Sequence, residues 1–152
     1  LLLEVAKELP KVQFVMAGGG DMLEEIKLKI TENIHVIGWV QAAMFWSAVD
    51  CAISTSDNEG MPIALIEAQL AGKVTIATNV GSNAEVVESG LTGLITEKDA
   101  KSIAMALESL IENPHAFKAM SQAALEISPK KFSMEIMIEK HITMYENLVA
   151  LT

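Results

Sequence analysis

The sequence predicts an α/β fold, in which a parallel sheet is covered by helices on both faces. Short apolar runs alternate with longer segments of helical periodicity along the chain, a pattern typical of parallel strands joined by helices. The strand-like runs, such as residues 12–17, are apolar almost throughout, as expected of strands buried on both faces. With 152 residues, 51% apolar and 20% charged, the chain is expected to form one globular domain. The alternation of strands and helices predicts that its sheet is doubly wound, or Rossmann-like.

The predicted elements follow each other in a regular order. Residues 1–9 have helical spacing and stop at Pro10, because a helix seldom continues into proline. Asp21 is a candidate cap for a helix that reaches about residue 30. The predicted strands are 12–17, 34–37, 51–54, 74–77 and 94–96. The remaining predicted helices are 42–48, 62–70, a turn opening at Ser82 or Asn83, 99–112, 114–127 and 133–150.

Four loops would meet at one edge of the predicted sheet. Ligands of doubly wound sheets bind beyond the carboxyl ends of the strands. The loops that begin there are the glycine turn at Gly18, the turn 38–40, the loop carrying Glu59, and residues 78–81. This edge is therefore the predicted ligand-binding edge.

Glu59 and Glu67 are separated by seven residues at this edge. Glu59 lies in a loop rich in turn formers, and Pro62 suits the first position of a helix because its missing N–H would have no helical partner. Glu67 follows about one and a half turns into that helix. A helix end with free N–H groups between two carboxylates fits a ligand with hydroxyls on both sides of a phosphate.

This segment resembles the donor-sugar half of retaining glycosyltransferases of the two-domain GT-B type (glycosyl transferases group 1, family 4). Their motif is roughly Ser-x-x-Glu-Gly-x-Pro/Gly-x-x-x-x-Glu-Ala, and the chain matches it with Ser56, Glu59, Gly60, Pro62, Glu67 and Ala68. Further matches are 15–20, 33–40, 71–73, 77–81, 85–87, 90–94, 132–133 and Tyr145. The resemblance implies the C-terminal half of a GT-B fold.

The resemblance also implies roles for the motif residues. Glu67 would accept hydrogen bonds from the 2′- and 3′-hydroxyls of the nucleotide ribose, since a carboxylate has two acceptor oxygens. Glu59 would face the transferred sugar as the catalytic carboxylate. Pro62 has no N–H, so the expected backbone donors to phosphate or sugar lie around it. The donor-binding residues expected here are Gly60, Met61, Ile63 and Ala64.

The glycine turn and the segment after the second strand give weaker signals. Gly18 and Gly19 begin a run that lacks the third glycine of a dinucleotide fingerprint, so a tight turn explains them from sequence alone. By resemblance, this turn lies near the nucleotide, and the backbone of Val40 pairs with the base. Trp39 and Trp46 are expected to pack rather than to stack on a base.

Composition and residue spacing argue against several classes of function. The net charge of −9 and pI near 4.7 argue against binding to nucleic acid or anionic lipid. No apolar run reaches the roughly 18 residues of a membrane span. Cys51 is the sole cysteine and is expected to be buried; no internal disulfide can form, which suits the cytoplasm. The histidines have no metal-ligand spacing, and His35 is expected in the core or at a sheet edge. We therefore predict neither a metal nor a cofactor.

The chain opens in a helical pattern at Leu1, which we interpret as an N-terminally truncated domain. Residues 1–152 would then form a single nucleotide-sugar-binding domain of a larger two-domain enzyme. In the family that the chain resembles, an Arg and a Lys in an earlier loop hold the diphosphate, and a separate N-terminal domain binds the acceptor. Without these parts, the fragment should be inactive and should leave a sheet edge or a core face uncovered.

The predicted function is transfer of a hexosyl unit from a nucleoside diphosphate sugar, UDP- or GDP-linked, to a glycan or lipid-linked acceptor of a bacterial surface polysaccharide. The acceptor would bind through the missing N-terminal domain, which could also hold the cytoplasmic enzyme at the inner membrane. Two alternatives stay open: a nucleotide-sugar epimerase of similar architecture, and a non-catalytic sugar-nucleotide-binding module. The sequence leaves the nucleotide, the sugar, the acceptor and the oligomeric state undetermined.

Overall fold

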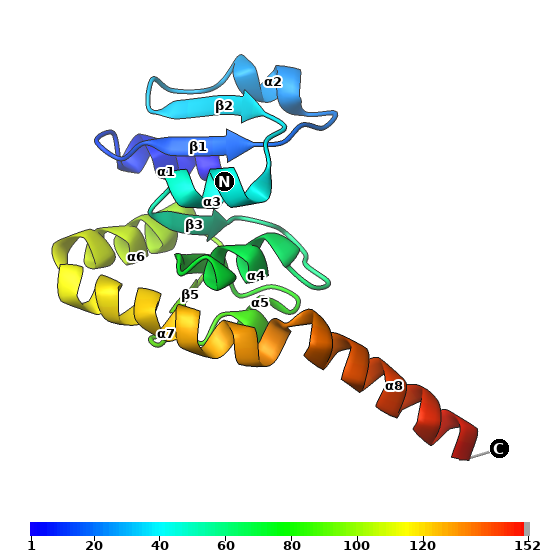
Figure 1. The fold of residues 1–152 in the computed structure, drawn as a ribbon. Coiled ribbons are helices and arrows are strands. Elements are labelled where there is room, and N and C mark those ends of the chain that lie inside the picture. The colour runs from blue at the N-terminus through cyan, green and yellow to red at the C-terminus, as the bar shows by residue number, and fades with distance from the viewer. Residues whose placement is uncertain (151–152) are drawn as a thin grey trace.

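The computed structural model describes residues 1–150, in which helices and strands alternate before three C-terminal helices (Figure 1). The strands are β1 (Phe14–Ala17), β2 (Ile34–Gly38), β3 (Cys51–Ser54), β4 (Val74–Thr78) and β5 (Gly93–Thr96). The helices are α1 (Leu2–Glu8), α2 (Leu23–Lys27), α3 (Ala42–Ala48), α4 (Ile63–Leu70), α5 (Asn83–Val86), α6 (Ala100–Glu112), α7 (Pro114–Phe132) and α8 (Met134–Ala150). The predicted α/β fold class is confirmed.

The strands form two parallel sheets, whereas the strand pattern predicted one. β1 pairs with β2, and β3, β4 and β5 form a second sheet in that order. Within the described residues, β1 and β3 do not pair with each other. Periodicity identifies the segments that become strands, but strand pairing depends on hydrogen bonds between distant segments, which periodicity does not contain.

A shared hydrophobic core, rather than a strand ladder, joins the two sheets. Phe14 of β1 and Val5 of α1 belong to one buried cluster with Ile76 of β4 and Ile103 of α6. A second cluster lies around α3 and α4 and contains Trp46. Because α1 also packs against α6, the two sheets belong to one packed domain.

Two predicted helix boundaries were wrong. α2 covers only Leu23–Lys27, and its N-cap is Met22 rather than Asp21, without a capping side chain. α7 continues past residue 127 to Phe132, although Pro129 lies inside it. Proline disfavours a helix interior by about 3 kcal/mol, and the buried Ser128 beside it shows that tertiary packing outweighs this local preference.

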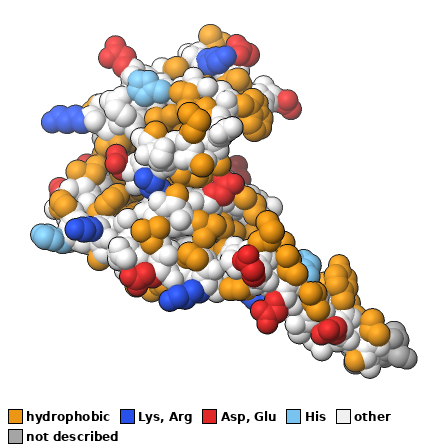
Figure 2. Space-filling view, viewed as in Figure 1, with side chains coloured by type: hydrophobic (Ala, Val, Ile, Leu, Met, Phe, Trp, Pro, Cys, Tyr) orange, Lys and Arg blue, Asp and Glu red, His pale blue; other side chains and the backbone are white. Residues whose placement is uncertain are grey.

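α8 projects from the rest of the protein and contacts mainly α7 (Figure 1). None of its residues is buried, and Figure 2 shows apolar side chains along it. The exposed apolar residues of α8 are Met134, Met137, Ile138, Ile142, Met144, Tyr145, Leu148 and Val149. Among residues 1–150, no helix combines the length and the apolar character that crossing a membrane requires.

Candidate functional site

The loop between β3 and α4 carries Glu59 and is held in place from inside. Ser56 Oγ donates a hydrogen bond to Glu59 Oε1 at 2.6 Å. Thr78, at the end of β4, donates in turn to the carbonyl oxygen of Ser56 at 3.1 Å. The half-buried Glu59 carboxylate therefore has one oriented oxygen, and Oε2 has no hydrogen-bond partner among residues 1–150. This free oxygen could accept from a ligand hydroxyl.

The loop after β4 fixes the backbone of Glu59. Gly81 lies in the left-handed region at φ +49°, and a Cβ there would lie 1.9 Å from the Glu59 carbonyl oxygen. The N–H of Ser82 donates to this same oxygen at 3.1 Å. Gly81 is thus required for the close approach of two loops, and this approach sets the position of Glu59.

An ion pair crosses the exposed side of the Glu59 loop. Lys98 Nζ lies 2.6 Å from Asp57 Oδ1. Hydrogen bonding and attraction to Lys98 lower the pKa of the Asp57 carboxyl. Both side chains are exposed, and such pairs contribute little to stability, so Gly81 and Ser82 dominate the placement of the loop.

α4 begins one residue later than expected, with Pro62 as its buried N-cap. The N–H of Ile63 donates to the Met61 carbonyl oxygen at 2.9 Å, so a ligand would compete with this turn for the Ile63 donor, and its role as a ligand donor stays a prediction. The tight turn at Pro62 uses this donor locally. Within the described residues, the N–H groups of Met61 and Ala64 have no protein acceptor, and they remain candidate ligand donors at the positive end of the helix.

Glu67 lies on α4, on the exposed side away from the buried Leu65 and Ala68. Trp46 of α3 donates its indole N–H to Glu67 Oε2 at 3.3 Å. Trp46 does pack in the core, as expected, and its ring meets Phe45 edge-on at 4.8 Å. The hydrogen bond between Trp46 and Glu67 was missed because it joins residues on different helices, and no sequence spacing predicts such a contact.

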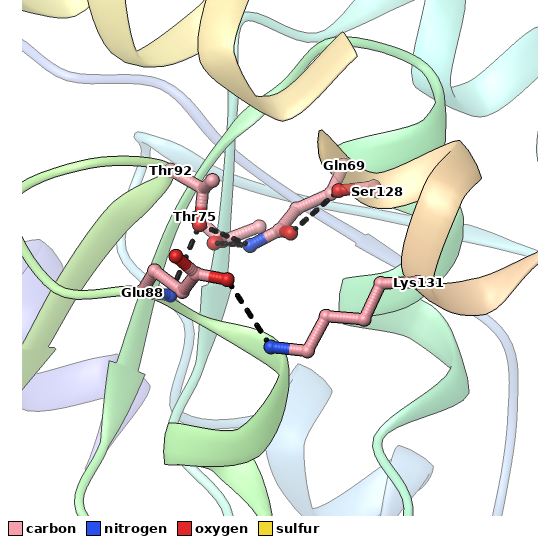
Figure 3. A network of polar contacts seen from close by, with 6 residues as sticks. All are labelled: Gln69, Thr75, Glu88, Thr92, Ser128 and Lys131. Atoms are coloured by element: carbon pink, nitrogen blue, oxygen red, sulfur yellow. Dashed lines mark hydrogen bonds and ion pairs between the residues drawn. The ribbon is translucent and has the colours of Figure 1, made fainter. Parts of the chain in front are cut away.

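A buried polar network is centred on Gln69, two residues after Glu67 on α4 (Figure 3). The Gln69 side-chain N–H₂ donates to Thr75 Oγ1 at 2.9 Å and to Thr92 Oγ1 at 3.1 Å. Ser128 of α7 donates to Gln69 Oε1 at 2.8 Å. All four side chains are at most 1% exposed. The network therefore ties the helix that carries Glu67 to β4, to the loop before β5 and to α7.

The glycine turn and Val40 lie at the end of the β1–β2 sheet. Gly18, at φ +108°, donates to the Gly38 carbonyl oxygen at 2.7 Å. The turn borders a small cavity of about 140 Å³ between β1 and α2. Val40 is 43% exposed. Trp39 is 86% exposed and only leans on Gly19, so the expectation that it packs was wrong.

The predicted site residues thus fall into two groups. The first group surrounds the start of α4 and consists of Glu59, Gly60, Met61, Ile63, Ala64 and Glu67. The second group, Gly18, Gly19 and Val40, surrounds the ends of β1 and β2. Among residues 1–150, no cluster of three or more His, Cys, Asp or Glu side chains could hold a metal ion. His35 is exposed on the edge strand β2 beside Gln13, as an edge histidine should be.

The single cysteine does not belong to this site. Cys51 is half-buried at the start of β3, and burial raises the pKa of its thiol to about 12. A thiol of this kind is a packing residue rather than a nucleophile.

The fold is that of the C-terminal half of GT-B glycosyltransferases. Residues 1–113 match the family model for glycosyl transferases group 1. The chain therefore belongs to the family of glycosyl transferases group 1.

Relatives and solved structures agree with this membership. The O-antigen biosynthesis glycosyltransferase WbnH of Escherichia coli is 26% identical over 98% of the chain. Sucrose-phosphate synthase of Thermosynechococcus elongatus superposes on 99% of the chain with a TM-score of 0.87 at 22% identity. HepE of Anabaena, solved with UDP and glucose, covers 97% of the chain with a TM-score of 0.83 at 22% identity. The chain spans 42% of the first two proteins and 43% of HepE.

Proposed function

We propose that the full-length protein is a retaining glycosyltransferase and that residues 1–152 form its donor-binding domain. It would move a hexosyl unit from a UDP- or GDP-linked sugar to a glycan or lipid-linked acceptor in the cytoplasm. The observation that carries this proposal is the pair Glu59 and Glu67 on either side of the start of α4. The UDP and glucose bound by the structurally similar HepE support it.

The arrangement divides the donor into three parts. Glu67 accepts from the ribose hydroxyls, and the positive end of α4 attracts the diphosphate. Glu59 faces the sugar, where its negative charge stabilises the positive charge that develops on the ring. The bond from the sugar to the diphosphate oxygen breaks with its electron pair on the diphosphate. The acceptor hydroxyl oxygen bonds to the same face of the sugar, and its proton passes to the departing diphosphate oxygen. We propose that no metal or other cofactor takes part.

The two glutamates should have separable effects in the full-length protein. We expect Glu67→Ala to weaken binding of the bare nucleoside diphosphate by about 1.5–3 kcal/mol, because the ribose loses a charged acceptor. Glu59→Ala should leave this affinity almost unchanged and lower turnover by about 100-fold or more. Calorimetry with UDP and GDP, together with turnover of the full donor, measures both effects.

A matched control for lost charge is Glu108→Ala, which removes an exposed acid from α6 on a different part of the surface. It should change neither quantity. Loss of nucleotide affinity in Glu59→Ala but not in Glu67→Ala would reverse the assigned roles. If neither variant differs from Glu108→Ala, the pair is not the donor site.

The 152-residue chain alone should bind nucleoside diphosphate sugars weakly, at about millimolar Kd (roughly −4 kcal/mol), and transfer no sugar. All eleven of its basic residues are lysines, so it has no arginine for a bidentate contact with the diphosphate. Titration of the chain with UDP-glucose and GDP-mannose, with a parallel turnover assay, tests this expectation. Submicromolar binding or turnover would mean that residues 1–152 already contain the complete donor site.

A further inference from the structure

The carboxylate of Glu67 is held by a buried indole. Trp46 is 9% exposed, and its Nε1 lies 3.3 Å from Glu67 Oε2. The indole is fixed by the second core cluster, and the ring of Phe45 meets it edge-on at an interplanar angle of 69°. Glu67 itself is exposed. A rigid donor thus points at a side chain that would otherwise sample several rotamers in water.

We propose that Trp46 is a positioning residue that orients Glu67 toward the ribose of the donor. This inference rests on the proposed function, which makes Glu67 the ribose acceptor. An indole N–H can only donate, and here it occupies one acceptor position of Oε2. Oε1 has no hydrogen-bond partner among residues 1–150, so the oriented carboxylate keeps this oxygen available to accept from a ribose hydroxyl.

The opposite assignment makes a different prediction. If Glu67 served only to satisfy a buried indole N–H, the contact would stabilise the fold and would not depend on the ligand. Loss of the N–H would then weaken binding of every nucleotide to the same extent. If Trp46 orients Glu67, the loss is confined to nucleotides that carry ribose hydroxyls. The ribose hydroxyls therefore separate positioning from simple stability.

The test compares Trp46→Phe with the wild type in the full-length protein, using UDP and 2′,3′-dideoxy-UDP, or the GDP pair if GDP binds better. We expect UDP to bind five- to tenfold more weakly to Trp46→Phe than to the wild type. The expected effect is modest because a hydrogen bond of 3.3 Å is long. The dideoxy compound should bind equally well to both proteins. Phe45→Leu keeps the indole N–H but removes its aromatic neighbour, and should leave the ratio of UDP to dideoxy affinities within twofold of the wild type.

The Glu67→Ala variant separates the failure of this inference from that of the proposed function. If Glu67→Ala still prefers UDP to dideoxy-UDP as the wild type does, Glu67 is not the ribose acceptor and the proposed function loses its support. If Glu67→Ala abolishes the preference but Trp46→Phe keeps it, only the positioning role is overturned. Equal weakening of both nucleotides by Trp46→Phe overturns the positioning role as well.

A second measurement needs no substitution in Trp46. In NMR spectra of the ¹⁵N-labelled full-length protein, the Trp46 indole N–H resonance should shift in Glu67→Ala. In the wild type it should shift on saturation with UDP and move less with the dideoxy compound. Sequence-specific assignment identifies the Trp46 signal, and Trp39→Phe distinguishes it from that of the other tryptophan of residues 1–152. If the chemical shift of the Trp46 indole N–H changes neither in Glu67→Ala nor on addition of UDP, the inference is overturned, even if Trp46→Phe does not fold.

Discussion

We expect Gln69→Leu to lower the free energy of unfolding by about 3 kcal/mol. The substitution keeps the side chain's approximate size but removes the amide that bonds Thr75, Thr92 and Ser128. These three hydroxyls are at most 1% exposed, so water cannot replace the lost partner. An unsatisfied buried polar group costs about 1–3 kcal/mol. Because a hydroxyl can rotate toward another acceptor, we expect each of the three hydroxyls to contribute only the lower end of this range.

Urea unfolding measures this effect as a lower midpoint with an unchanged m-value. Gln122→Leu is the matched control, because Gln122 is an exposed residue of α7 whose amide bonds only Glu126, one turn away. Its expected cost is within about 0.5 kcal/mol. A loss below about 1 kcal/mol in Gln69→Leu would show that the network relaxes and that α4 is held by apolar packing alone.

The network also bears on the site, since Gln69 lies two residues after Glu67 on α4. Ser128 connects Gln69 to α7 (Figure 3). Further along α7, Lys131 Nζ lies 3.2 Å from the Glu88 carboxylate. The N–H of Glu88 donates in turn to the Thr92 hydroxyl of the network. The C-terminal part of α7 is thereby connected to α4 through Gln69. In Gln69→Leu we therefore expect weaker nucleotide binding to accompany the loss of stability.

The sequence predicted the elements of this fold better than their connections. All five strands form at or within two residues of their expected positions, because apolar runs between turn formers are local signals. The division into two sheets and the extension of α7 through Pro129 depend on contacts between distant segments. Local preferences contain no information on such contacts.

The same distinction holds for the candidate site. Glu59 and Glu67 could be found from their spacing around a helix start, because both lie within one loop–helix unit. Trp46 and Gly81 could not, because each acts on a glutamate that lies more than twenty residues away. No pattern in the sequence distinguishes Gln69 from other polar residues of a helix, and only its burial against three hydroxyls reveals its role.

Gly81→Ala should reduce turnover of the full-length protein by at least about 100-fold, because it displaces Glu59. The new Cβ would lie 1.9 Å from the Glu59 carbonyl oxygen and 2.9 Å from the Glu59 nitrogen. These are backbone atoms, which cannot rotate away as a side chain can. The Glu59 loop must therefore move, and a shift of about 1 Å is enough to cost about 100-fold in a positioned reaction. Stability should fall by about 2–3 kcal/mol from clash and backbone strain together.

Gly90→Ala separates the clash from the strain. Gly90 also has a positive φ, +83°, but a Cβ there has no atom within 4 Å. It should therefore cost only the backbone term, about 1 kcal/mol, and leave turnover close to that of the wild type. Thermal unfolding and donor turnover of both variants decide the question. If Gly81→Ala behaves like Gly90→Ala, the Glu59 loop is free to adapt, and its position in the active enzyme is set by the bound donor rather than by the loop after β4.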